Sequence, residues 1–169
     1  MTAVITALVG LIGVLVGVLL SFFLQRRLWQ TQEAMKAYSE LFSFGNETLR
    51  RCFDVLNLIL SDKPEQADEH NRILHEKYDP TFRRLLRQCW MLERHAATRS
   101  RIEDFQQKYV DCKVGLKLRF GRDKELDDEI AETPTPNTLF DLLESLQREV
   151  AAKYFHGGEP NGGREGDRA

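Results

Sequence analysis

Few side chains in this sequence have types and spacings that support catalysis or metal binding. His75 and Asp79 lie four residues apart and share one face of a helix, but a lone His–Asp pair is usually a surface contact. The cysteines include no C-x-x-C pair. The chain has neither the G-x-S-x-G motif of serine hydrolases nor a phosphate-binding glycine loop. We therefore predict no catalytic residue, no metal site and no cofactor.

The three cysteines, Cys52, Cys89 and Cys112, are odd in number, widely spaced and surrounded by apolar positions of predicted helices. A disulfide framework needs an even and denser set. We therefore expect reduced, buried thiols, which are typical of a reducing compartment. A zinc site or a reactive thiol is the alternative.

Charge patterning is more informative about binding. The segment 81–101 carries six arginines and one acid, Glu93, and Arg83, Arg87, Trp90 and Arg94 align on one predicted helix face. Arginine beside an aromatic ring suits phosphate oxygens and lipid headgroups. This face is a candidate patch for anionic lipid or an acidic partner. We favour the simpler interpretation, in which it is solvated or pairs with the acidic block 123–132. The net charge of −2 does not favour nucleic acid.

The start of the chain is predicted to cross a membrane. Residues 3–24 include no charged side chain, and a helix of that length spans about 33 Å against a hydrocarbon core of about 30 Å. A cleaved signal peptide would have a basic start, a shorter apolar run and small residues at its end. We therefore expect an uncleaved, single-pass transmembrane helix.

The residues around this apolar run predict its orientation and its packing. Arg26 and Arg27 follow it directly, and the positive-inside rule then places the N-terminus outside and the remainder in the cytoplasm. Trp29 suits the interface, where the two arginines meet anionic headgroups. Small residues recur every four positions at Gly13, Gly17 and Ser21, a spacing that favours close packing against a second helix in lipid.

Beyond Leu28 the apolar residues recur at steps of three and four, which indicates amphipathic helices and no strand. One helix extends to about Leu60 or is split at Gly45-Asn46, with Asn46 as a cap, and the sequence leaves this open. Further helices are expected over 64–78, from Pro80 to about Ala96, over 102–120 with coiled-coil-like spacing, and over 139–154. A turn is expected at Thr98–Ser100, a stop at Gly121, and a short helix around 126–131. The fold class is all-α, a transmembrane helix followed by an antiparallel bundle of four to five helices.

Three regions follow: a transmembrane anchor with its basic flank at 1–27, a cytoplasmic helical bundle at 28–156, and a disordered polar tail at 157–169. The leading hypothesis is a membrane-anchored interaction or scaffold protein, not an enzyme. It associates with itself or another membrane protein through the anchor. One alternative is a membrane-perturbing or pore-forming effector. Another is a membrane-associated enzyme whose site the sequence does not reveal.

Overall fold

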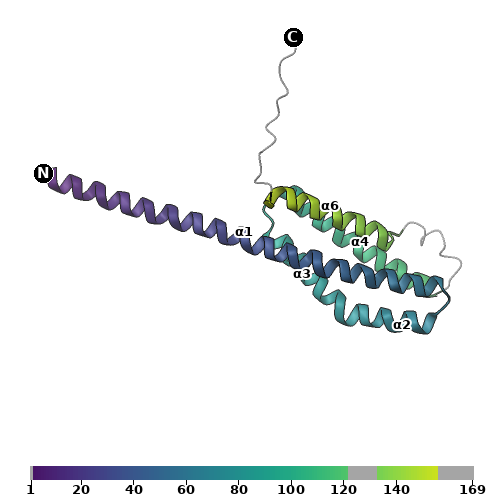
Figure 1. Ribbon diagram of the computed structural model, residues 1–169. Helices are drawn as coiled ribbons and strands as arrows, with labels where there is room; N and C mark the ends of the chain where they lie inside the picture. Colours follow the sequence, from purple (N-terminus) through teal and green to yellow (C-terminus); the bar gives the residue numbers. More distant parts are fainter. Residues whose placement is uncertain (1, 122–132, 156–169) are drawn as a thin grey trace, which may run out of the picture.

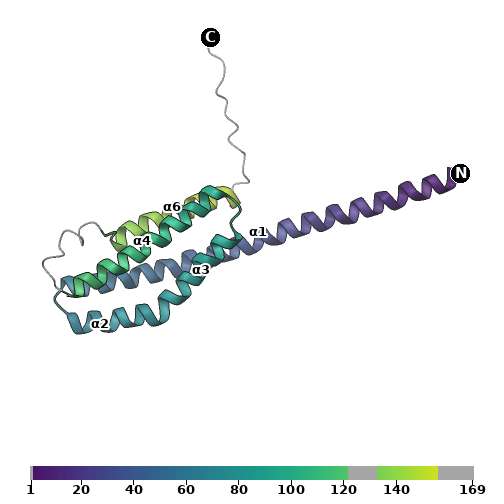
Figure 2. The ribbon, with the colours of Figure 1, turned by 180° about the vertical axis from the view of Figure 1, so that it is seen from behind.

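A computed structural model describes residues 2–121 and 133–155, with the backbone alone for residues 2–9, 11, 12, 120, 121 and 155. These residues form helices and no strand. The elements are α1 (Thr2–Leu60), α2 (Pro64–Ile73), the π-helical turn η1 (Leu74–Tyr78), α3 (Asp79–Leu92), α4 (Ala96–Gly121) and α6 (Pro136–Phe155). Helix α1, the segment from α2 to α3, helix α4 and helix α6 run in alternate directions and pack side by side. The predicted all-α helical bundle is therefore confirmed (Figure 1; Figure 2).

Helix α1 is continuous from Thr2 to Leu60, which settles the question that the sequence left open. Gly45 does not break it, and Asn46 does not cap a second helix. A Cβ at Gly45 would lie 3.0 Å from Phe82 Cε2 and 3.1 Å from Leu143 Cδ2, so α3 and α6 approach α1 closely at this point. Glycine is therefore present because neighbouring side chains need the space, although it weakens an isolated helix.

The turns agree with the sequence at one end of the bundle and differ from it at the other. Asp62 adopts a positive φ of 56° in the turn between α1 and α2, and Pro64 begins α2 as expected. The turn predicted at Thr98–Ser100 is wrong, because α3 ends at Leu92 and α4 has already begun at Ala96. Helix α4 extends to Gly121, the residue at which the sequence ended it. The helix predicted around 126–131 lies outside the described residues.

The core lies among α1, α3, α4 and α6 and is rich in aromatic rings. Phe82 packs edge-on against Phe105 and Tyr109, with ring centroids 5.9 and 5.0 Å apart. The predicted seam of α4 is buried at Ile102, Phe105, Tyr109, Cys112 and Leu116. Cys52, Cys89 and Cys112 are free and buried, as the sequence predicted. Burial raises the pKa of all three thiols, to about 12 for Cys89 and about 11 for Cys112.

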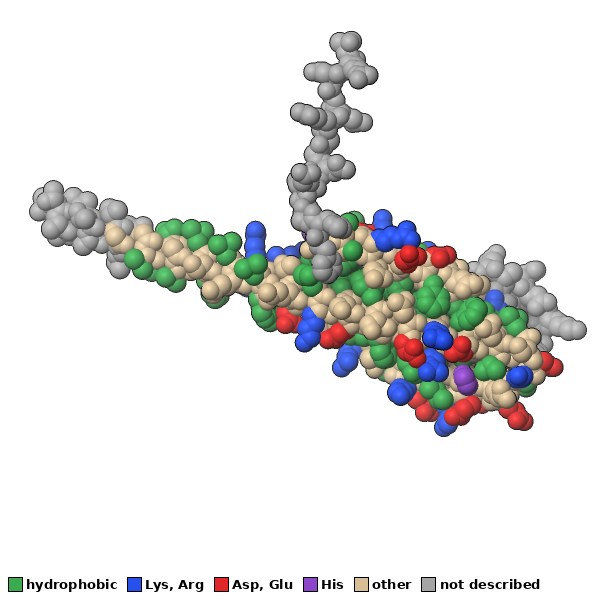
Figure 3. All heavy atoms as spheres, in the orientation of Figure 1, with side chains coloured by type: hydrophobic (Ala, Val, Ile, Leu, Met, Phe, Trp, Pro, Cys, Tyr) green, Lys and Arg blue, Asp and Glu red, His purple; other side chains and the backbone are tan. Residues whose placement is uncertain are grey.

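The first half of α1 extends alone from the bundle (Figure 1). We call the segment 2–29 the stalk. Its described side chains from residue 13 onward are exposed, and apolar groups lie along it in Figure 3. The side chains of residues 3–9, 11 and 12, which belong to the predicted span, lie outside the described set. Across the described part of the chain, no helix has the length and apolar character needed to cross a membrane.

Candidate functional site

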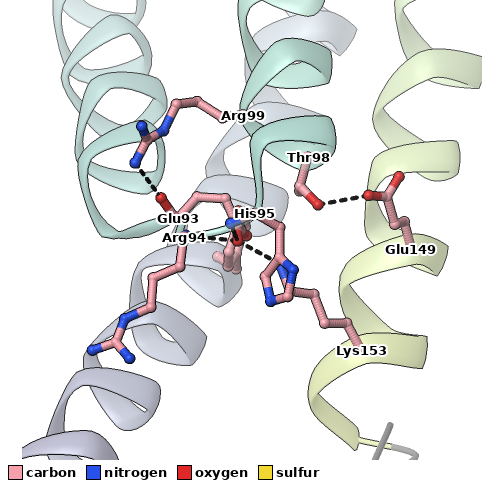
Figure 4. A network of polar contacts seen from close by, with 8 residues as sticks. Glu93, Arg94, His95, Thr98, Arg99, Glu149 and Lys153 are labelled. Atoms are coloured by element: carbon pink, nitrogen blue, oxygen red, sulfur yellow. Dashed lines mark hydrogen bonds and ion pairs between the residues drawn. The ribbon is translucent and has the colours of Figure 1, made fainter. Parts of the chain in front are cut away.

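The turn between α3 and α4 holds a buried carboxylate, Glu93, at the end of the bundle next to the stalk. Its side chain is 0 % exposed. Tyr38 of α1 donates its hydroxyl to Oε2 at 2.6 Å, and the backbone N–H groups of Arg94 and His95 donate to Oε1 at 2.8 and 2.9 Å. Lys153 of α6 places its ammonium on the same Oε1 (Figure 4). One carboxylate therefore joins α1, the α3–α4 turn and α6.

The electrostatics of Glu93 are those of a compensated buried charge. Burial on its own raises the pKa of a carboxyl group, because the charged form loses its hydration. Hydrogen bonds from Lys153 and Tyr38 outweigh burial, so the pKa of Glu93 lies below its ordinary value. Burial, together with the neighbouring carboxylate, raises the pKa of the Tyr38 hydroxyl, which keeps it a neutral donor. Glu93 is therefore ionised at neutral pH, with its charge balanced inside the protein.

Further polar contacts hold the start of α4 against its neighbours. Thr98 donates to Oε1 of Glu149 on α6 at 2.7 Å, and Arg101 contacts the other oxygen of the same carboxylate at 2.6 Å. Arg99 donates to the backbone carbonyl of Glu93 at 2.5 Å (Figure 4). Its guanidinium also lies 4.8 Å from the centre of the Trp90 ring. The arginines of α4 therefore take part in intramolecular contacts.

The predicted anionic-partner patch does not form one helix face. Arg83 pairs with Asp79 at 3.1 Å, and Asp79 also binds the buried ammonium of Lys113 at 2.8 Å. Trp90 is half-buried. It donates Nε1 to Glu103 at 2.7 Å. Arg87 is exposed on α3, whereas Arg94 lies beyond the end of that helix, in the turn.

Arg87 and Arg94 differ from Arg83, the third arginine of the predicted patch, because neither forms an ion pair with any described residue. The acidic block 123–132, which the sequence offered as an internal partner, lies outside the described residues. The internal partner that the structure describes for Arg83 is Asp79. The Asp79 carboxylate also contacts Lys113, so the surroundings of His75 and Asp79 include two cations that the sequence did not indicate. Burial and the nearby lysines 113 and 117 lower the pKa of His75.

The predicted membrane residues lie on the stalk. A Cβ added at Gly13 or Gly17 would meet nothing within 4 Å, and Ser21 is exposed. Arg26, Arg27 and Trp29, the residues predicted to lie at a membrane interface, are exposed as well. The stalk glycines therefore have no packing partner among the described residues of this chain.

Two open grooves flank the exposed face of α1 within the bundle. A groove of about 340 Å³ between α1 and α6 has an apolar floor that includes Tyr38, Phe42 and Val150. A groove of about 530 Å³ between α1 and α3 is more polar and includes Glu40, Glu47 and Arg84. Among residues 2–121 and 133–155, no three His, Cys, Asp or Glu side chains gather closely enough to hold a metal ion.

Sequence reasoning noted Glu93 only as the single acid of an arginine-rich segment. The position of Glu93 as the lone acid among arginines was the one local indication of its role. A carboxylate that is buried needs a specific counter-ion. Its partners Tyr38 and Lys153 are 55 and 60 residues away, so no local pattern identifies them. Comparison with protein-family models, curated proteins and solved structures finds no match.

Proposed function

We propose that this chain is a membrane-anchored helical interaction protein, with its bundle in the cytoplasm. The carrying observation is the apolar surface of the stalk. The exposed fractions of its large apolar side chains from Val14 to Leu24 range from 49 to 66 %. They point to every side of the helix, because the run is nearly uninterrupted. A helix that is apolar on all sides is expected in a protein core or in a membrane, and this segment is outside the bundle core.

The residues beyond the run support the same placement. Arg26 and Arg27 begin where the apolar run ends, and Trp29 follows within one turn. This order matches the passage from hydrocarbon to headgroups, where tryptophan and arginine are favoured. The described residues from Gly13 onward supply only part of a span. The proposal therefore includes the whole run from Ala3 to Leu24.

Extraction of membranes at alkaline pH tests the anchor. The full chain should stay in the membrane pellet and dissolve only in detergent. Leu15→Arg with Leu19→Arg should move it to the supernatant, since each central arginine costs about 2.5–3.5 kcal/mol of insertion free energy. The matched control is Leu60→Arg with Val114→Arg, at exposed apolar positions of the bundle, which should stay in the pellet. Release of the unmodified chain at alkaline pH would contradict the anchor.

We further propose that the anchor associates with a second copy through Gly13, Gly17 and Ser21. Supporting this, the two glycines weaken the helix by about 1 kcal/mol each relative to alanine, while no described contact requires a glycine there. Close approach of a second helix gives these small residues a role.

Cross-linking in intact membranes tests the association. Gly13→Ile with Gly17→Ile should abolish a cross-linked dimer. Val14→Ile with Val18→Ile changes another face of the same helix and should keep it. Equal cross-linking of all three proteins would remove these residues from the interface. The pore-forming alternative predicts that the unmodified chain also dissipates membrane potential and that the glycine variant does not.

A further inference from the structure

We infer that the surface formed by Arg87, Met91 and Arg94 is a contact site for anionic membrane lipid. This contact determines the tilt of the bundle toward the bilayer, between a leaning and an upright position. We call these three residues the proximal patch. The inference rests on the proposed anchor, because the anchor determines which end of the bundle faces the membrane. It deepens that function by naming the partner of the arginine-rich segment.

The exposed surface around Arg87 and Arg94 is positively charged. Between Thr81 and Arg101 the sole acid is Glu93, which is buried and balanced by Lys153. The exposed surface of the segment therefore carries arginine charge without a carboxylate of its own. Of the three arginines on the predicted patch, Arg83 pairs with Asp79, whereas Arg87 and Arg94 form no ion pair with described residues.

An apolar side chain, Met91, lies between the two arginines in the sequence. Met91 is 62 % exposed, and among the described large apolar side chains of the bundle Leu60 is more exposed, at 73 %. Residues 87 and 91 are four apart in α3 and share a face, and Arg94 follows just beyond the end of that helix. An exposed apolar side chain flanked by two arginines suits a membrane interface, where headgroup phosphates and acyl carbons lie at neighbouring depths.

The α3–α4 turn holds Arg94 close to α1. The turn that carries Arg94 is fixed beside Tyr38 of α1 by Glu93, and its backbone N–H is held at 2.8 Å. In Figure 4 the Arg94 side chain points away from α6, whereas His95 lies beside Lys153 of α6. The α3–α4 turn lies at the end from which the stalk leaves the bundle in Figure 1. The turn that carries Arg94 therefore lies at the end of the bundle nearest the proposed bilayer.

The distance between the end of the apolar run and the start of the bundle is short. Leu24 ends the apolar run and Ala34 is the first buried residue of α1 in the bundle. Ten residues of helix span about 15 Å, of which the headgroup layer occupies about 5–7 Å. The remaining gap is about one Debye length at physiological salt, roughly 8 Å. Membrane helices tilt by about 20° on average, and a tilt toward the α3–α4 turn closes part of that gap.

Trp90 provides a reporter beside the patch. The chain has two tryptophans, so Trp29→Phe leaves Trp90 alone. The full chain with this substitution is reconstituted into vesicles of phosphatidylcholine, alone or with phosphatidylserine, that contain a dansyl-labelled headgroup. Energy transfer from Trp90 to dansyl should be greater with phosphatidylserine. It should return to the neutral-lipid value at about 1 M salt, where the Debye length is about 3 Å.

Charge reversal tests the patch itself. Arg87→Glu with Arg94→Glu should abolish the gain in transfer. The ratio of leaning to upright bundles should fall at least about 25-fold, because each of the two arginines near an anionic surface contributes a factor of about five. Arg50→Glu with Lys63→Glu makes the same charge change far from the stalk and should keep the gain.

The outcomes separate the two proposals. A chain that fails to float with vesicles refutes the anchor. A chain that floats but shows equal transfer in both lipids, or keeps its gain in the Arg87, Arg94 variant, refutes the lipid contact. Equal transfer together with patch-dependent capture of an acidic peptide would instead assign the surface to a protein partner.

Discussion

Replacing Lys153 by methionine tests the Glu93 network most directly. Methionine keeps much of the length and apolar volume of the lysine stem but removes its ammonium. Glu93 then keeps three hydrogen-bond donors, the Tyr38 hydroxyl and two backbone N–H groups, and loses its counter-ion. Removing one partner of a buried ion pair costs about 3–5 kcal/mol, because a charge is left uncompensated. The three remaining donors place the expected loss near the lower end, at about 3 kcal/mol.

The assay is equilibrium unfolding by urea of the full chain in a mild detergent, followed by far-ultraviolet circular dichroism. The slope of the transition should not change, so that the shift in midpoint reports stability. Lys108→Met is the matched control. It removes a lysine whose Nζ lies 3.0 Å from Oδ2 of the exposed Asp104, and such exposed pairs contribute less than about 0.5 kcal/mol.

The pH dependence gives the prediction its sign. In the unmodified chain the pKa of Glu93 lies below its ordinary value, so its ionised form contributes stability above the unfolded-state pKa. That contribution is lost as the pH falls through the folded-state pKa. In Lys153→Met, burial acts without the ammonium and the pKa of Glu93 should rise. Protonation then favours the folded variant.

The stability difference between the two proteins should therefore be greatest near neutral pH and should narrow as the pH falls toward about 4.5. A loss no larger than that of Lys108→Met, or a difference that stays constant with pH, would show that Glu93 is not a buried charge held by Lys153.

Three further outcomes follow from the same structure. Tyr38→Phe should lower the free energy of unfolding by about 1.5–3 kcal/mol, since it removes a hydroxyl that donates to a charged acceptor, and the urea midpoint measures this loss. Gly45→Leu should destabilise the chain by at least about 1–3 kcal/mol, because even a Cβ there already meets Phe82 and Leu143, whereas Gly45→Ala should be far milder in the same experiment. The three cysteines should react with a disulfide reagent near pH 8 only after urea is added, because burial both raises their pKa values and blocks access, and rapid labelling of the native chain would contradict this.

Much of the fold was predictable because its signal is local. The three-four spacing of Ile102, Phe105, Tyr109, Cys112 and Leu116 describes a helix with one apolar face, and all five are buried. Pro64 predicted the start of α2 for an equally local reason, since proline at the first turn lacks an N–H that has no partner there.

The features that were not predictable depend on contacts between distant residues. Gly45 appeared to interrupt α1, because no local pattern reveals that Phe82 and Leu143 occupy the space beside it. The α3–α4 turn was placed several residues too late. What favours a chain reversal at Glu93 is the donation by Tyr38 and Lys153, from the first and last helices of the bundle. The same contacts separate Arg94 from the helix face that its spacing suggested.

The continuity of α1 gives these contacts a mechanical consequence. A hinge between anchor and bundle requires a break such as proline or a disrupted backbone hydrogen bond, and α1 is helical throughout between the stalk and Tyr38. Tyr38 is bound through Glu93 to the α3–α4 turn and to Lys153 of α6. Rotation or tilt of the stalk must therefore be transmitted to the whole bundle, unless the Glu93 contacts and the packing of Ala34 and Leu41 break. In the proposed setting, the anchor and the bundle tilt as one body, so a change in anchor packing or tilt reorients the grooves beside α1 together with the anchor.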